Sequence, residues 1–278
     1  MVVTTVSPSL TPELRILADE LREAERLRRP IPTPSATNAA LTVGDAYEIQ
    51  RFNIGVREAA GERRVGRKIG LTSLAMQQQL GVDSPDFGVI TDAMVVPDGG
   101  ELDAAALIAP RVEAEFAFRI GRDLHPSPSA EELADAVDGV AVALEIIDSR
   151  VADWKIGLVD TVADNASSAR IVTGGFVAPT RSLLAALPEA IVTMRRDGEQ
   201  VAAGPGSAVL GDPLVSLRWL ADAIGAFGDA FQAGDVVLAG AVDRAAPLAP
   251  GQSWEASAEG FPAVAFRTLP MTTAQGGA

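Results

Sequence analysis

The chain has 278 residues, enough for one large domain or two small ones with a substantial core. Its formal net charge of −14 argues against nonspecific nucleic-acid binding, which needs a basic surface. The lack of cysteine excludes disulfides and zinc–thiolate sites and is typical of a cytoplasmic protein. No apolar run approaches the roughly 20 residues that span a bilayer, and there is no signal-peptide pattern, so we expect no membrane association.

The first part of the sequence, residues 1–64, is predicted to be a helical section that packs on the core. Thr11-Pro12 supplies a capping hydroxyl and a proline at the first helical position, which predicts the start of a helix that ends before Pro30. A second helix is predicted from about Thr42 to about Gly61.

Residues 65–270 are predicted to form a mixed α/β or α+β core, because short apolar runs alternate with turn signals and helical patterns. Capping signals predict helices after Ser129 and after Asp212. Residues 271–278 are predicted to be a flexible tail. The predicted strands are Val65–Ile69, Met94–Val96, Val112–Ile120, Val140–Ile147, Arg170–Val172, Ala190–Met194, Val236–Leu238 and Ala263–Phe266.

Three carboxylates occur in two of these strand-like runs. Glu113 and Glu115 lie two residues apart, so they point to the same face of their strand. Glu145 lies inside the apolar run Val140–Ile147. A carboxylate in a buried strand is costly unless it is paired or binds a metal ion, and three oxygen ligands suit Mg²⁺ or Mn²⁺.

The residues alone leave simpler interpretations open. A strand with one wet face would show the same alternation, with Glu113 and Glu115 in water. Glu145 could instead pair with an arginine such as Arg150. Lys68 stands between two glycines, where it is either a solvated strand lysine or a partly desolvated one that exchanges protons.

Few other residues suit acid–base chemistry. The single histidine, His125, lies in a loop-like stretch, so we expect such chemistry from Lys, Asp or Glu. Pro85–Gly88 is interpreted as a turn. The sequence has no Walker motif and no Gly-x-Gly-x-x-Gly fingerprint, so nucleotide binding has no support.

Taken together, several segments resemble the 2-hydroxypentadienoate hydratase (2-keto-4-pentenoate hydratase) family of the fumarylacetoacetate hydrolase-like superfamily, which also includes 4-oxalocrotonate decarboxylases. The resemblance runs in order over about residues 10–268. The matching segments are Val65–Ser73, Gln77–Val82, Pro85–Gly88, Pro110–Glu115, Leu144-Glu145 with Ser149-Arg150, Asp160–Ser167, Leu210–Pro213, Trp219–Ala221 and Ala233–Asp235.

The resemblance implies a mixed fold with a strand-rich, rolled core of the fumarylacetoacetate hydrolase type, outer helices and assembly into a homo-oligomer. It also assigns roles to individual residues. The implied ligands of Mg²⁺ or Mn²⁺ are Glu113, Glu115 and Glu145; the implied catalytic residues are Lys68 and Asp86; the implied substrate-binding residues are Thr72, Ser73 and Ser167.

The implied activity is that of a hydro-lyase that adds water to 2-hydroxypenta-2,4-dienoate and gives 4-hydroxy-2-oxopentanoate in meta-cleavage catabolism of aromatic compounds or steroids. Asp153–Ile156 and Val159–Asn165 are similar to the hydratase branch. The alternatives are a 4-oxalocrotonate decarboxylase and an acylpyruvate-type C–C hydrolase. The three carboxylates argue against a purely structural subunit. Association with a pathway aldolase or decarboxylase is a further expectation.

Overall fold

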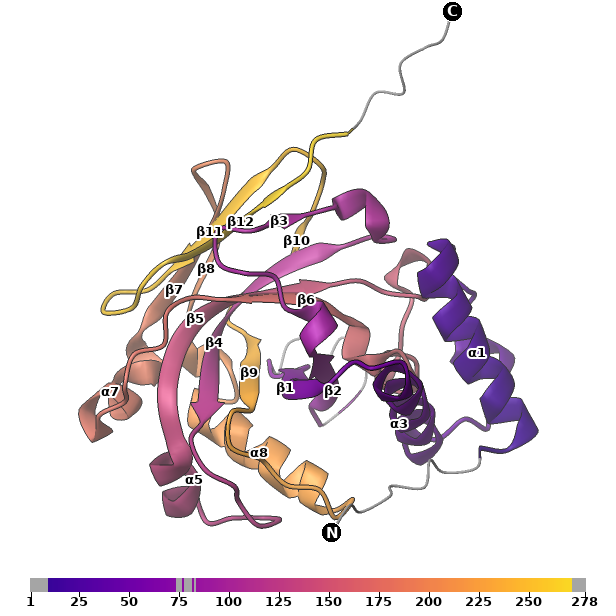
Figure 1. The fold of residues 1–278 in the computed structure, drawn as a ribbon, viewed down its shortest axis with the longest axis horizontal. Helices are drawn as coiled ribbons and strands as arrows, with labels where there is room; N and C mark the ends of the chain where they lie inside the picture. Colours follow the sequence, from indigo (N-terminus) through magenta and orange to yellow (C-terminus); the bar gives the residue numbers. More distant parts are fainter. Residues whose placement is uncertain (1–9, 74–76, 78–81, 83, 272–278) are drawn as a thin grey trace, which may run out of the picture.

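The computed structural model describes residues 10–73, 77, 82 and 84–271. Within them, a strongly curved seven-stranded sheet forms the centre of the fold (Figure 1). Its strands are β1 (Arg64–Gly70), β2 (Asp86–Thr91), β4 (Arg111–Ile120), β5 (Val137–Ile147), β6 (Ser168–Thr173), β9 (Val236–Ala241) and β10 (Ala246–Pro247). The strand order is β2-β1-β9-β4-β5-β6, and β10 pairs with β4. The long strands β4 and β5 are antiparallel and carry the curvature (Figure 1).

A second, five-stranded sheet packs against β4, β5 and β6. Its strands are β3 (Glu101–Leu102), β7 (Ile191–Arg196), β8 (Glu199–Pro205), β11 (Ser253–Ser257) and β12 (Val264–Thr268), in the order β3-β12-β11-β7-β8. Trp254 and Phe266 of this sheet are fully buried, as are Phe116 and Phe118 of β4. These large side chains form one hydrophobic core between the sheets.

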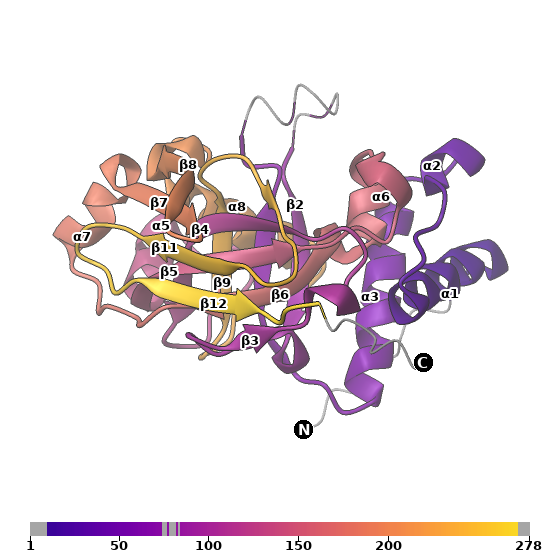
Figure 2. The ribbon, with the colours of Figure 1, turned by 90° about the horizontal axis from the view of Figure 1, so that it is seen from above.

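The helices lie outside the sheets. They are α1 (Pro12–Leu27), α2 (Pro34–Thr37), α3 (Val43–Ala59), α5 (Ala130–Ala136), α6 (Leu158–Ala163), α7 (Arg181–Ala186) and α8 (Pro213–Gly225). Seen from above, α1, α2, α3 and α6 gather at one end of the molecule, and α7 lies at the other (Figure 2). In the described part of the chain, no helix combines the length and apolar character that crossing a membrane requires.

The predicted mixed fold with a rolled, strand-rich core and a helical N-terminal section is confirmed. The caps also form as the sequence predicts: the hydroxyls of Thr11 and Thr42 accept hydrogen bonds from the first turns of α1 and α3. Ser129 and Asp212 cap α5 and α8 in the same way. Residues 272–278 of the predicted tail, and most of Gln77–Val82, lie outside the described residues.

Two local predictions are wrong. Three of the four residues in the turn predicted at Pro85–Gly88 begin β2 instead, because Asp86, Phe87 and Gly88 pair with β1. The strand predicted at Met94–Val96 is a short 3₁₀ turn ending at Met94, after which Val95 makes a single bridge to Ile171. The sequence also did not predict β8 or β11, whose alternation is weak because Gly, Ala and Ser occupy many of their positions.

Candidate active site

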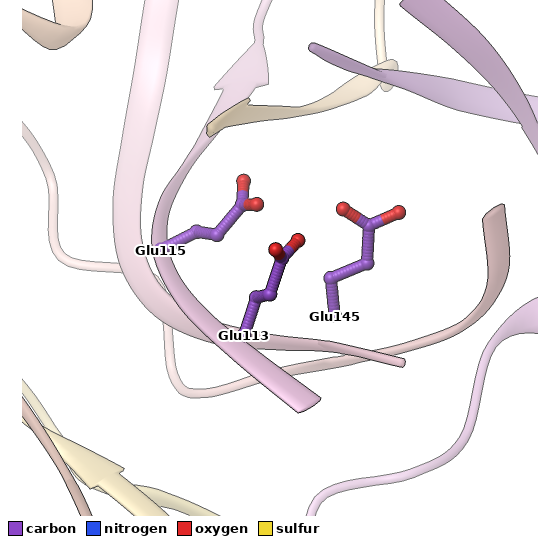
Figure 3. A group of neighbouring side chains, drawn as sticks. All are labelled: Glu113, Glu115 and Glu145. Carbon is purple, nitrogen blue, oxygen red and sulfur yellow. The ribbon is translucent and has the colours of Figure 1, made fainter. Parts of the chain in front are cut away.

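Three carboxylates meet on the inside of the curved sheet. In the β4–β5 pairing Glu113 lies directly opposite Glu145, and Glu115 follows two residues later on the same face. Each carboxylate places an oxygen within 4.8 Å of the other two (Figure 3). Glu113 is 8% exposed, Glu115 1% and Glu145 0%, so the wet-face interpretation is wrong.

The cluster is electrostatically costly. Loss of water contact is the largest cause that raises the pKa of each of the three carboxyls above its ordinary value, and their mutual repulsion raises the pKa of Glu113 and Glu115 further. The pKa of Glu113 rises from 4.5 to about 7. These groups can remain ionised together only if positive charge lies close to them.

Lys68 supplies one such charge. Its Nζ lies 3.4 Å from Oε2 of Glu145, and its side chain is 5% exposed, so the solvated-lysine interpretation is wrong. Burial alone would lower the pKa of Lys68, but the attraction of the surrounding carboxylates raises it above its ordinary value. Arg150 is not the partner of Glu145, because it forms a buried ion pair with Asp164 and donates to the carbonyl oxygen of Asp148 at 2.7 Å.

Asp86 faces the same lysine from the neighbouring strand. It pairs with Gly70 in the β1–β2 register, and a Cβ at Gly70 would lie 2.2 Å from Oδ1 of Asp86 and 3.3 Å from Nζ of Lys68. The lack of a side chain at Gly70 therefore lets these two groups approach each other. Thr161 Oγ1 donates to Oδ2 of Asp86 at 3.2 Å. Burial raises the pKa of the Asp86 carboxyl, although Lys68 lowers it.

Thr72 lies beside the backbone that holds Glu115. The N–H of Gly240 donates to Oε2 of Glu115 at 2.7 Å. A Cβ at Gly240 would lie 2.4 Å from Oγ1 of Thr72, so the threonine side chain fills the space above this glycine. Thr72 is buried, and Ser73, which follows it, is half-buried.

Ser167 is 3% exposed, and its Oγ has no hydrogen-bond partner among the described residues. It ends the 3₁₀ turn Asn165–Ser167, directly before β6, and β6 pairs with the strand that carries Glu145. A buried hydroxyl without a partner is uncommon in proteins and suggests that a ligand completes its hydrogen bonding.

The oxygen atoms of the cluster fit a hard divalent cation. Oε1 of Glu115 and both carboxylate oxygens of Glu145 accept no hydrogen bond from the described residues. Four carboxylates, counting Asp86, act on the single charge of Lys68, so full ionisation would give a net charge of −3 (four negative charges and one positive). An all-oxygen ligand set of this kind is typical of Mg²⁺, Ca²⁺ and Mn²⁺ sites.

Local sequence patterns do not mark Thr161, Gly240 or Asn165 as site residues. Thr161 and Asn165 lie in Asp160–Ser167, a segment that matches the family, and this match is the sequence signal that points to them. Gly240 follows three buried residues of β9, and its φ of +115° is a conformation that favours glycine.

The chain is similar over most of its length to proteins of known name. It is 42% identical over 244 residues to the 2-hydroxyhexa-2,4-dienoate hydratase of Comamonas testosteroni, which covers 87% of this chain and 92% of that protein. It is also 42% identical over 257 residues to the 2-keto-4-pentenoate hydratase of Paraburkholderia xenovorans, with 92% and 95% covered. The chain belongs to the 2-keto-4-pentenoate hydratase family. A 4-oxalocrotonate decarboxylase of a Pseudomonas species is 38% identical over 91% of this chain and 96% of its own length.

Solved structures agree with the family. The 4-oxalocrotonate decarboxylase from Pseudomonas putida G7, complexed with magnesium and adipate, matches with a TM-score of 0.88 and 36% identity over 94% of this chain and 99% of that one. The fumarylpyruvate hydrolase from Pseudomonas aeruginosa, complexed with Mn²⁺ and pyruvate, matches with a TM-score of 0.59 and 18% identity over 75% and 90%, which shows a shared fold alone. No protein-family model matches the chain.

We expect the metal-free protein to lose stability as pH rises, more steeply in the wild type than in Glu113→Gln. The raised pKa of Glu113 means that its contribution to stability is present below pH 4.5 and is lost as pH rises to about 7. Urea unfolding in the presence of a chelator, followed by tryptophan fluorescence between about pH 5 and about pH 8, measures the free energy of unfolding. Equal pH dependence in the two proteins would contradict this electrostatic account.

Proposed function

We propose that this protein is a divalent-metal-dependent hydro-lyase that adds water to 2-hydroxypenta-2,4-dienoate and releases 4-hydroxy-2-oxopentanoate. The observation that carries the proposal is the buried group of three carboxylates beside Lys68. It occurs in a chain that is 42% identical to proteins named as hydratases of this substrate class. Such a reaction belongs to meta-cleavage catabolism of aromatic compounds or steroids.

The proposed metal ligands are Glu113, Glu115 and Glu145. A bound Mg²⁺ or Mn²⁺ would supply Lewis-acid polarisation of the substrate's C1 carboxylate and C2 oxygen. The chain's own contribution is a rigid arrangement of the three carboxylates, since β4 and β5 fix two of them opposite each other and Gly240 fixes the third. Without added positive charge this cluster would repel an anionic 2-oxo acid.

Lys68 and Asp86 are the proposed catalytic residues. The raised pKa of Lys68 keeps its ammonium protonated, so it can stabilise negative charge that develops on the substrate. Asp86 has one oxygen held by Thr161 and one, Oδ1, without a hydrogen-bond partner among the described residues. Its raised pKa suits a group that takes a proton from water and returns it to carbon.

This assignment gives a balanced reaction. The C2 hydroxyl of the dienol loses its proton while C5 gains one, which gives a conjugated enone. Water then adds at C4, and the proton that the water loses is balanced by one gained at C3, which gives 4-hydroxy-2-oxopentanoate. Asp86 relays these protons, while Lys68 remains a cation throughout. Thr72, Ser73 and Ser167 are proposed to bind the substrate, and the unpartnered hydroxyl of Ser167 supports its part in this role.

The decarboxylase alternative has its own support. A 4-oxalocrotonate decarboxylase is 38% identical to this chain, and the structure with the TM-score of 0.88 is also one. The higher identity to proteins named as hydratases favours hydration. The acylpyruvate hydrolase alternative rests on a shared fold alone, because the corresponding structure is 18% identical.

Several further proposals accompany the activity. We propose a homo-oligomer in the cytoplasm, with residues 1–64 as a helical section and residues 65–270 as the catalytic core. Association with a pathway aldolase or decarboxylase also stays a prediction.

An ultraviolet assay tests the reaction type. We expect 2-hydroxypenta-2,4-dienoate to lose its diene absorbance in the presence of Mg²⁺, while 2-oxo-3-hexenedioate releases no CO₂. Glu115→Gln should abolish the metal-dependent rate because the cation loses a charged ligand. Rapid CO₂ release would identify a decarboxylase, and full hydration by chelator-treated enzyme would contradict the metal's role.

Replacement of Lys68 tests the proposed ammonium. Lys68→Met removes the charge without leaving a cavity, so we expect kcat to fall about 100- to 1,000-fold while KM changes much less. The affinity for Mn²⁺, measured by calorimetry, should not weaken, because a repelling cation has been removed. The exposed Lys155 provides the control, and Lys155→Met should keep the wild-type rate. A wild-type kcat in Lys68→Met would show that the lysine has no part in the chemistry.

A further inference from the structure

The turn that carries Ser167 has an uncommon backbone. Asn165, Ala166 and Ser167 have φ angles of +54°, +51° and +53°, so three consecutive residues other than glycine adopt the left-handed region. This region is unfavourable for L-residues, and asparagine tolerates it best. Backbone of this kind persists only when its surroundings hold it, and it tends to cluster at functional sites.

The side chain of Asn165 links the turn to β2 through two hydrogen bonds. Its Oδ1 accepts a hydrogen bond from the N–H of Val89 at 2.8 Å, and its Nδ2 donates to the carbonyl oxygen of Val89 at 2.9 Å. β2 is the last strand of its sheet, so these backbone groups lie on the edge away from β1. The side-chain amide of Asn165 therefore makes the hydrogen bonds to Val89 that a neighbouring strand would make if β2 were not at the edge.

The turn and β2 are in close contact as well. A Cβ at Gly88 would lie only 2.5 Å from the carbonyl oxygen of Asn165, so the absence of a side chain at Gly88 lets the turn approach. In the β1–β2 register Gly88 lies opposite Lys68, and Asp86 lies two residues away on the same face. Asn165 thus joins the strand of Asp86 to the turn of Ser167.

Other contacts fix the remainder of the turn. Arg150 forms its buried ion pair with Asp164, the residue before Asn165. The N–H of Ser167 donates to the carbonyl oxygen of Asp164 at 3.0 Å, and the N–H of Asp148 donates to the carbonyl oxygen of Ser167 at 2.8 Å. The backbone N–H and C=O of Ser167 thus have partners, whereas its hydroxyl oxygen has no hydrogen-bond partner among the described residues.

We propose that Asn165 is a positioning residue: its two hydrogen bonds to Val89 hold the left-handed turn so that the Ser167 hydroxyl points at the substrate. The inference rests on the proposed function, since it requires that Ser167 contact the substrate. It assigns Asn165 no contact with substrate or metal. A displacement of about 1 Å in a substrate-contacting group is enough to lower turnover by about 100-fold.

Asn165→Asp is the sharpest test. It keeps the acceptor for the Val89 N–H and tolerates the left-handed backbone, but it places a carboxylate oxygen against the Val89 carbonyl. We expect kcat for 2-hydroxypenta-2,4-dienoate hydration to fall about 10- to 100-fold, with the Kd for Mn²⁺ unchanged. Asn165→Gly, which preserves the backbone conformation and removes both hydrogen bonds, should show the same loss and replaces the first variant if that one does not fold.

The matched control is Asn53→Asp, at an asparagine of α3 whose Oδ1 accepts a hydrogen bond from Arg22 of α1. This variant should keep the wild-type kcat.

Combination with Ser167→Ala separates positioning from general support of the fold. If Asn165 acts through the Ser167 hydroxyl, Asn165→Asp should lower kcat by less than about twofold when Ser167 is already alanine. Equal losses in both backgrounds, or a wild-type kcat in Asn165→Asp, would overturn the proposal. A wild-type kcat in Ser167→Ala would overturn both this proposal and the substrate-binding role of Ser167, while a lack of any hydration by the wild type would refute the proposed function itself.

Discussion

The burial of three glutamates around one lysine is the constraint on which the rest of this structure depends. A buried carboxylate loses its hydration, and like charges that share a site repel one another, so the cluster costs stability that the fold must supply elsewhere. The surrounding sheet supplies it: β5 is buried over nearly its whole length, and the second sheet covers β4 with large apolar side chains. A well-packed apolar frame holds the carboxylates where they would otherwise move apart.

The same constraint explains the small residues around the site. Gly70 lets Lys68 and Asp86 approach each other, Gly240 offers its N–H to Glu115 beneath Thr72, and Gly88 admits the turn that carries Ser167. Each omits a side chain where two functional groups or two segments of backbone must come close. The geometry of the site therefore depends on the lack of a Cβ atom at these three glycines as well as on the carboxylates.

Much of this could be predicted from the sequence, and the limits have physical causes. Alternation placed Glu113 and Glu115 on one face, but a wet face and a buried metal site give the same pattern, so only burial could decide between them. The position of Glu145 depends on strand register, which a single strand does not reveal. Asp86 follows a proline and precedes Phe-Gly, a composition typical of a turn, yet pairing with β1 makes it a strand. The resemblance to a family supplied the roles that local patterns could not.

The central claim is that the carboxylates of Glu113, Glu115 and Glu145 together bind one divalent cation. Anomalous diffraction from crystals grown with Mn²⁺ tests it most directly. The account predicts a single strong peak within about 2.5 Å of an oxygen from each glutamate, beside the Lys68 ammonium. A fully loaded protein with no peak at this position, or with its manganese bound elsewhere, would contradict the account.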